Sequence, residues 1–292
     1  MNMNEYEKYK IQSTQNMQTI YFWLKNNGFS EHHIKLLRKN SKSFKVNGSF
    51  CNIKQKLEIG DTLEILTNPQ KASEVPLCDG EVEILYEDDE YLIVNKPHLL
   101  ACIPTRSHIS DNLGGRICNY MKTRQENFVL RIVNRLDKDT AGIVVVAKDI
   151  KSYNNLKSLD KTYYALCEGT FEQQSFTIDK PILTISANGI NEMRRVISDK
   201  GKQAITHATV LKEFQNYSLL KVKLETGRTH QIRVHLSSEG HPLLGDSLYS
   251  ENTSQKSHTF LLLKEVSFFH YKTGKKISIE VPFPKDWNEY IK

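Results

Sequence analysis

The stretch that most constrains the fold is residues 131–149, R-I-V-N-R-L-D-K-D-T-A-G-I-V-V-V-A-K-D. Two runs rich in β-branched residues, 130–133 and 143–147, flank a polar loop, and such runs are typical of strands. The loop carries four charged residues within five positions, namely Arg135, Asp137, Lys138 and Asp139. We expect Gly142 to let the chain turn sharply into the second run. The stretch therefore predicts a strand, a tight charged loop and a buried strand, which would hold a carboxylate rigidly, as catalysis requires.

The residues of this loop are compatible with three interpretations. A surface turn held by ion pairs is the commonest one on spacing alone. A metal site through Asp137 and Asp139 is the second, although no compact set of histidines or cysteines accompanies these two carboxylates. A catalytic carboxylate is the third.

Composition limits the class of protein. A chain of 292 residues, 39% hydrophobic and 25% charged, fits one large and one small globular domain. Because no apolar run could span a bilayer and no charged-then-apolar leader opens the chain, we expect a cytoplasmic protein without a membrane partner. The five cysteines lack C-x-x-C spacing and predict neither a disulfide framework nor a zinc site; they are Cys51, Cys78, Cys102, Cys118 and Cys167.

The positive charge is concentrated near the start of the chain. Residues 1–71 hold 11 Lys or Arg against 6 Asp or Glu, whereas residues 72–292 hold 29 against 28. A small basic unit suits a polyanion such as RNA, because neutralised phosphates release counterions. A merely solvated basic face is equally compatible with this charge.

Periodicity organises residues 19–66. Apolar residues at helical spacing predict two short helices broken at Asn27-Gly28, with Ser30 as an N-cap; these residues are Ile20, Trp23, Leu24, Ile34 and Leu37. A strand over residues 44–46 then leads into an Asn-Gly turn, and residues 57–65 close the unit.

The rest of the chain predicts alternating strands and short helices. Strands are expected from residues 82 and 91, over 161–169, over 217–224 and within 260–281, and helices over 112–121 and 150–158. Asp149 would cap the second of these helices, and Thr229 would cap a third that runs to about Ser238. Residues 67–80 contain two prolines and few periodic apolar residues, and within them 72–80 predict a linker. The gaps between His230, His235 and His241 do not favour a zinc site.

Four strings carry a family resemblance. N-R-L-D-K-D-T-A-G at residues 134–142 resembles the catalytic motif H-R-L-D-x-x-T-S-G of the RluA-type pseudouridine synthases, departing from it at Asn134 and Ala141. V-N-K-P at 94–97 resembles another family segment, although His98 and Leu99 stand where a Gly-rich turn usually follows. K-T-Y-Y-A-L-C-E-G at 161–169 and T-G-R-T-H-Q-I-R-V-H at 226–235 resemble K-x-Y-x-A-x-x-x-G and T-G-R-x-H-Q-I-R-x-H.

The resemblance implies a fold that periodicity alone leaves at α+β. We expect the pseudouridine synthase fold over residues 81–292, which is a mixed, mostly antiparallel bent sheet flanked by helices around a central cleft. Residues 1–71 resemble the small α+β alpha-L (ribosomal S4-like) RNA-binding module. Its basic residues would face structured RNA, and they are Lys35, Arg38, Lys39, Lys42 and Lys45.

The resemblance also implies an activity, the isomerisation of uridine in RNA without a cofactor or a metal. Asp137 would be the catalytic carboxylate, Tyr163 would lie against the uracil, and Arg233 would form an ion pair with Asp137. Substrate contacts are expected from Arg135, Arg228 and His230. Ribosomal RNA of the large subunit is the expected partner of a monomeric enzyme, ahead of transfer RNA.

Two other classes of function remain open. The chain could be a catalytically inactive RNA-binding or ribosome-assembly protein that retains the fold. It could also be a metal-dependent hydrolase that uses Asp137 and Asp139.

Overall fold

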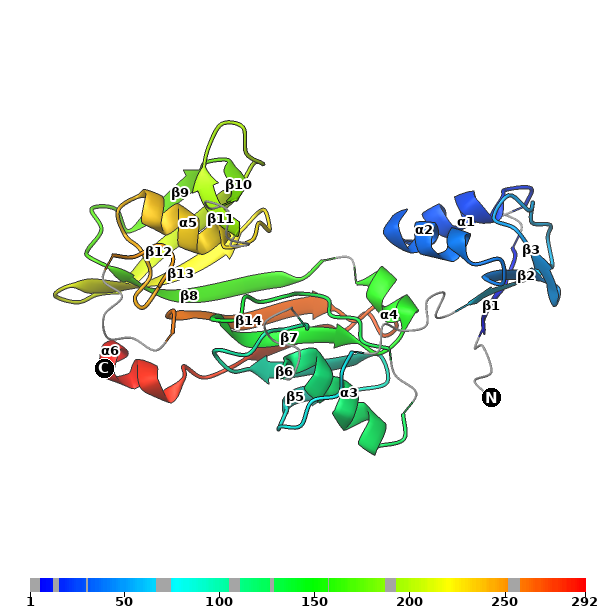
Figure 1. The fold of residues 1–292 in the computed structure, drawn as a ribbon, viewed down its shortest axis with the longest axis horizontal. Coiled ribbons are helices and arrows are strands. Elements are labelled where there is room, and N and C mark those ends of the chain that lie inside the picture. Colours follow the sequence, from blue (N-terminus) through cyan, green and yellow to red (C-terminus); the bar gives the residue numbers. More distant parts are fainter. Residues whose placement is uncertain are drawn as a thin grey trace.

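The structure is a computed structural model that describes residues 6–12, 16–29, 31–66, 75–104, 111–126, 129–156, 158–186, 193–251 and 258–292. Figure 1 shows a small unit at one end and a large sheet that fills the rest of the molecule. Within the described part of the chain, no helix is both long enough and apolar enough to cross a membrane.

The small unit is a four-stranded sheet covered by two helices. Its elements are β1 (Tyr6–Lys10), α1 (Ile20–Asn26), α2 (Glu31–Lys39), β2 (Phe44–Val46), β3 (Ser49–Cys51) and β4 (Thr62–Leu66), and the antiparallel strand order is β1-β4-β2-β3. The five apolar residues predicted from helical spacing are all buried in its core. Asn47 and Gly48 both have positive φ, as the predicted hairpin turn requires. Strand β1 was not predicted, and Ser30 lies outside the described residues.

The large sheet has nine strands. They are β5 (Glu83–Glu87), β6 (Tyr91–Lys96), β7 (Ala141–Ala147), β8 (Asp160–Glu168), β9 (Ser175–Asp179), β12 (Ile205–Glu213), β13 (Tyr217–Leu224), β14 (Leu261–Phe269) and β15 (Lys276–Glu280). The order is β5-β6-β7-β14-β8-β13-β12-β9, with β15 also paired to β14. Among the described pairings of this sheet only β7 with β14 is parallel, which confirms the expected mixed, mostly antiparallel sheet.

Short helices and a second small sheet flank the strands. The helices are α3 (Leu113–Thr123), α4 (Ile150–Asn155), α5 (Gln231–Ser238), η2 (Lys285–Trp287) and α6 (Asn288–Ile291), and the small sheet pairs β10 (Ile182–Ser186) with β11 (Met193–Ile197). Asp149 caps α4 as predicted, since its side chain accepts bonds from the amides of Lys151 and Ser152. The α+β class is therefore confirmed.

The stretch around the charged loop differs from its prediction in two ways. Residues 130–133 form only a one-residue bridge, between Ile132 and Val146, instead of a strand. Gly142 lies inside β7 with φ 116°, and a Cβ there would collide with the carbonyl oxygen of Leu263 on β14. Glycine is thus needed for the close parallel approach of β14 rather than for a turn.

The two units have separate hydrophobic cores and meet near α4. Lys151 of α4 pairs with Glu7 at 2.7 Å and lies over the ring of Tyr9. The structure describes only residues 75–80 of the predicted linker, and these residues pack against the large unit instead of spanning open solvent. A Cβ at Gly115 would collide with Pro76 and Cys78, so the glycine lets this segment pack closely on α3.

Candidate active site

The loop that carries Asp137 is held at its base by Asn134. The Asn134 amide donates to the carbonyl of Ile143 at 3.0 Å, and its oxygen accepts the amide of Val145 at 2.8 Å. At the other end, the amide of Thr140 donates to the carbonyl of Asp137 at 3.1 Å. The side chain of Asn134, one of the departures from the family motif, therefore continues the backbone pairing that Arg131 and Val133 make with β7.

A buried lysine also holds this loop through hydrogen bonds to backbone carbonyls. Lys96, the last residue of β6, donates from Nζ to the carbonyls of Pro97, Leu100 and Lys138, at 2.9, 2.7 and 3.0 Å. Burial lowers the pKa of Lys96 to about 8, although the nearby carboxylates oppose the shift. The lysine of the V-N-K-P string thus ties β6 to the loop that carries Asp137, a role that sequence reasoning did not assign.

Asp137 lies beside His230 and close enough to Tyr163 for its charge to act on the phenol. Its side chain is 32% exposed, and its Oδ2 is 3.8 Å from Nε2 of His230. Tyr163 on β8 is buried; burial, with the negative charge of Asp137 adding to it, raises the pKa of its phenol. Three residues predicted from distant strings are thereby brought to one place.

The ring of His230 is oriented by a neighbouring tyrosine. Its Nδ1 is 3.0 Å from the hydroxyl of Tyr249, which also accepts the amide of Arg195 at 3.3 Å. Burial raises the pKa of Tyr249, so the hydroxyl keeps its proton and can donate it to Nδ1. The Nε2 of a neutral His230 then carries hydrogen and faces Asp137. Burial also lowers the pKa of His230, which favours this neutral form.

Arg233 pairs with a different carboxylate from the one expected. Its Nε and one terminal nitrogen each donate to Asp246 at 2.7 Å, and both side chains are buried. Burial alone would lower the pKa of Arg233, but the bonds to Asp246 raise it, and the charge of Asp137 acts in the same direction. The predicted direct ion pair between Arg233 and Asp137 is therefore wrong. Sequence reasoning assigned no role to Asp246.

Helix α5 also begins differently. Its N-cap is His230 in the left-handed region, with φ 57° and no side-chain cap, so the predicted cap by Thr229 is wrong. Gln231 instead supplies the local bonds, because its oxygen accepts from the amide of Arg228 and the hydroxyl of Thr226. With its backbone in this left-handed conformation, His230 has its ring beside Asp137.

The remaining predicted contacts form two groups. Arg135 is exposed in the loop of Asp137, and Arg228 is exposed beyond it, with its Nε donating to the carbonyl of Gln203 at 2.9 Å. Four basic residues are exposed on the small unit, away from Asp137, namely Lys35, Arg38, Lys39 and Lys42.

Comparison with known proteins identifies the family of the chain. Residues 90–238 match the family model described as RNA pseudouridylate synthase. The RNA pseudouridine synthase YjbO of Bacillus subtilis is 32% identical over 91% of this chain and 95% of its own length. Ribosomal large subunit pseudouridine synthase D of Pseudomonas aeruginosa is 32% identical over 83% of this chain and 81% of its own.

Among solved structures, human RNA Pseudouridylate Synthase Domain Containing 1 superposes with a TM-score of 0.57 at 22% identity. The superposition covers 73% of this chain and 86% of the human one, and it shows a shared fold. Fold, motifs and relatives agree, and the chain belongs to the RluA-type family of RNA pseudouridine synthases.

Proposed function

We propose that this enzyme isomerises specific uridines of large-subunit ribosomal RNA. The observation that carries the chemistry is the partly exposed carboxylate of Asp137, set on a rigid loop against a buried tyrosine and a neutral histidine. The substrate class is supported by relatives named as ribosomal large subunit pseudouridine synthases and by the basic small unit.

The reaction requires the target base to leave the RNA stack. Flipping costs a few kcal/mol, and Arg135, exposed two residues before Asp137, is placed to occupy the vacated space and contact phosphate. The bond from C1′ to N1 then breaks and a bond from C1′ to C5 forms, while the C5 proton is lost and N1 gains one. Asp137 acts either as the nucleophile at C1′ or as the base that starts elimination to a glycal.

The neighbours of Asp137 have different tasks in this scheme. Tyr163 packs against the uracil, and its raised pKa favours this positioning role over a role as a phenolate base. His230 faces Asp137 with Nε2 at 3.8 Å, close enough for its ring to limit where the carboxylate and the substrate can lie. Arg233 contributes positive charge to the site from its buried pair with Asp246.

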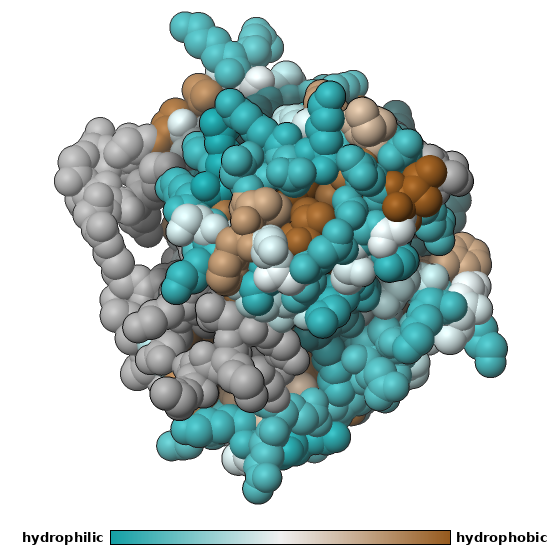
Figure 2. All heavy atoms as spheres, turned by 90° about the vertical axis from the view of Figure 1, so that its right-hand side faces the viewer, coloured by the Kyte–Doolittle hydropathy of each residue, from teal (hydrophilic) through white to brown (hydrophobic). Residues whose placement is uncertain are grey.

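The small unit is the proposed RNA-binding surface. An open hollow of about 630 Å³ lies beside α2 and β3, and its lining includes Arg38, Phe50 and Lys54. Phe50 is exposed and Lys45 lies 4.9 Å from its ring, an arrangement that can stack a base next to a cation. Figure 2, viewed from the side of this unit, shows a mainly hydrophilic face with small apolar spots.

The test is a pseudouridine map of total RNA from cells with the intact protein, with a deletion and with Asp137→Asn. We expect the same large-subunit uridines to lose modification in both deficient strains. Asp139→Asn is the matched control, since it removes the neighbouring carboxylate and should retain activity. Loss of modification at transfer RNA sites would instead identify transfer RNA as the substrate. An unchanged map would favour an RNA-binding protein, and a chelator-sensitive requirement for both carboxylates would favour a hydrolase.

Removing residues 1–71 tests the binding surface separately. Because this unit carries most of the excess positive charge, the truncated protein should bind ribosomal RNA more weakly and with a shallower dependence on salt concentration. An unchanged salt slope would remove this unit from the proposal.

A further inference from the structure

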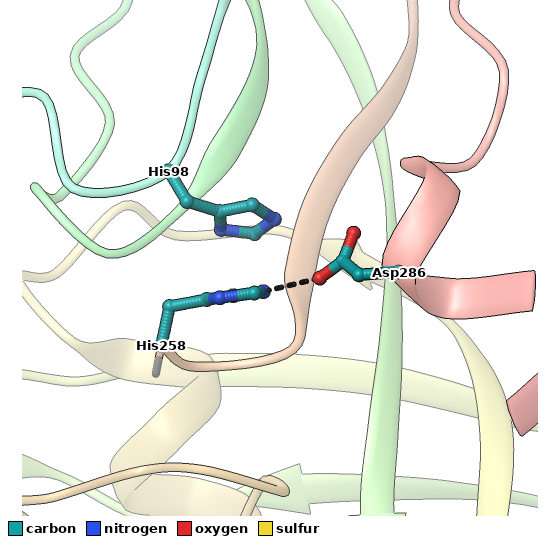
Figure 3. Close-up of side chains that lie close together, drawn as sticks. All are labelled: His98, His258 and Asp286. Carbon is teal, nitrogen blue, oxygen red and sulfur yellow. Dashed lines mark ion pairs between the residues drawn. The ribbon is translucent and has the colours of Figure 1, made fainter. Parts of the chain in front are cut away.

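Two histidines and an aspartate from three distant segments meet beside the catalytic loop. His98 follows β6, His258 precedes β14 and Asp286 lies in η2. Figure 3 shows the two rings one above the other with the carboxylate at their edge. The ring centroids are 3.8 Å apart, Nε2 of His258 is 2.9 Å from Oδ2 of Asp286, and the three ligand atoms lie within 4.8 Å of one another.

The hydrogen bond of His98 leaves its other nitrogen ready to bind. Its Nδ1 is 2.9 Å from the carbonyl oxygen of Asp139, and because a carbonyl can only accept, Nδ1 must carry the hydrogen. Nε2 therefore holds a lone pair, and it is buried without a hydrogen-bond partner. Metal-binding histidines usually have this arrangement, with the second ring nitrogen donating to a carbonyl.

We propose that His98, His258 and Asp286 bind one divalent transition-metal ion of the zinc class. Two imidazole nitrogens and one carboxylate oxygen are a common ligand set for zinc, and water can take the fourth position. A tetrahedral site needs ligand atoms about 3.4 Å apart, so the side chains would draw together, and His258 would exchange its contact with Asp286 for a bond to the ion, with its hydrogen moving to the other ring nitrogen. The ion would be structural, because the ligand set does not include Asp137.

The effect of the ion would reach the catalytic loop through His98. The carbonyl that His98 contacts belongs to Asp139, two residues after Asp137. A bound ion would therefore tie this loop to the C-terminal segment of η2. His98 stands where the family usually has a Gly-rich turn, so the site would be a particular feature of this chain.

A second group of possible ligands makes a useful contrast. Asp88, Glu90 and His270 also lie close together, but their lone pairs are already used. Nδ1 of His270 accepts two backbone amides, and Glu90 pairs with Lys272 at 2.6 Å. The ammonium group supplies the positive charge that a metal would bring, so no ion is proposed there.

The test is titration of the full chain, freed of any tag and of metal, with Zn²⁺ and with Co²⁺. We expect saturable binding of one ion per chain at micromolar concentration, with the visible absorption of tetrahedral Co²⁺. Zn²⁺ should also raise the melting temperature. His98→Asn and Asp286→Asn should each weaken binding at least tenfold and abolish the rise in melting temperature.

His207→Asn is the matched control, since it removes an exposed histidine that pairs with Glu225 and should leave binding unchanged. Circular dichroism verifies that each variant is folded, and Asp286, which is exposed, gives a variant expected to fold even if His98→Asn does not. Absence of saturable binding to the intact chain, or equal binding by the Asp286 variant, would overturn the proposal. Isomerisation activity does not enter this readout, so it is independent of the proposed substrate.

Discussion

Replacing Asp246 with alanine should destabilise the protein strongly, because it leaves the charge of Arg233 buried and unpaired. Arg233 is 2% exposed and Asp246 is 0% exposed, and two bonds of 2.7 Å join them. Breaking a buried pair by removing one partner costs about 3–5 kcal/mol. That is about two to three and a half powers of ten in the unfolding constant. It is also a large share of the total stability of a typical domain, about 5–15 kcal/mol.

The double variant Arg233→Met, Asp246→Leu distinguishes the net contribution of the ion pair to stability from the cost of leaving one charge unpaired. With both charges removed, most of the loss should be recovered, since two apolar side chains can fill the same space. Recovery should be incomplete, because Asp246 also accepts the amides of Leu248 and Tyr249, at 3.0 and 3.2 Å. If the positive charge of Arg233 assists Asp137, the double variant should be folded but slow in isomerisation.

The assay is urea unfolding followed by circular dichroism. Asp160→Ala is the control, because Asp160 pairs with Lys223 at 3.1 Å with both side chains about half exposed or more, and such pairs contribute about 0–1 kcal/mol. A loss below about 1 kcal/mol for Asp246→Ala would refute this reasoning. A double variant no more stable than the single one would refute it too.

Three further predictions concern residues that support the Asp137 loop and His230. The pKa of Lys96 falls from 10.5 to about 8 on folding, so the unfolded chain binds more protons than the folded chain between these pH values. The free energy of unfolding should therefore rise with pH by up to about 3 kcal/mol relative to that of Lys96→Met. If this is wrong, urea unfolding at pH 8 and at pH 10.5 would show the same difference between the two proteins. Leu99 has φ 61° and is 49% exposed, so Leu99→Gly should stabilise the protein by about 0.5–1 kcal/mol, measured as a higher urea midpoint that Leu99→Ala does not reproduce. Tyr249→Phe should release Nδ1 of His230, slow isomerisation and alter its pH profile, and ¹⁵N NMR of the imidazole should report a changed tautomer; an unchanged spectrum would contradict this orientation.

Local patterns predicted the elements that depend on neighbours along the chain. Helical spacing identified α1 and α2, alternation identified β13, and Asp149 was recognised as the cap of α4. These features are set by side chains within one or two turns, so a single sequence contains them. Motif resemblance likewise identified the residues that meet at Asp137.

The predictions from sequence were wrong where contacts with segments far away in the chain determine the local structure. Gly142 looked like a turn residue, but its requirement comes from β14, more than a hundred residues away. Residues 130–133 have the composition of a strand, yet their backbone pairing with β7 is limited to the bonds of Arg131 and Val133, and the side chain of Asn134 makes the next two. Thr229 has the right type for a cap, whereas His230 takes that position in the left-handed region.

The sequence by itself determined the fold class and the reaction family and singled out Asp137 as the proposed catalytic carboxylate, because these depend on periodicity and on motifs contiguous along the chain. The tertiary structure alone decided the partners of those residues. Arg233 pairs with Asp246 rather than with Asp137, and Lys96 donates to three carbonyls. His98 lies beside His258 and Asp286. Buried charges take whichever partner the packed chain brings within hydrogen-bonding distance, and spacing along the sequence does not specify that distance.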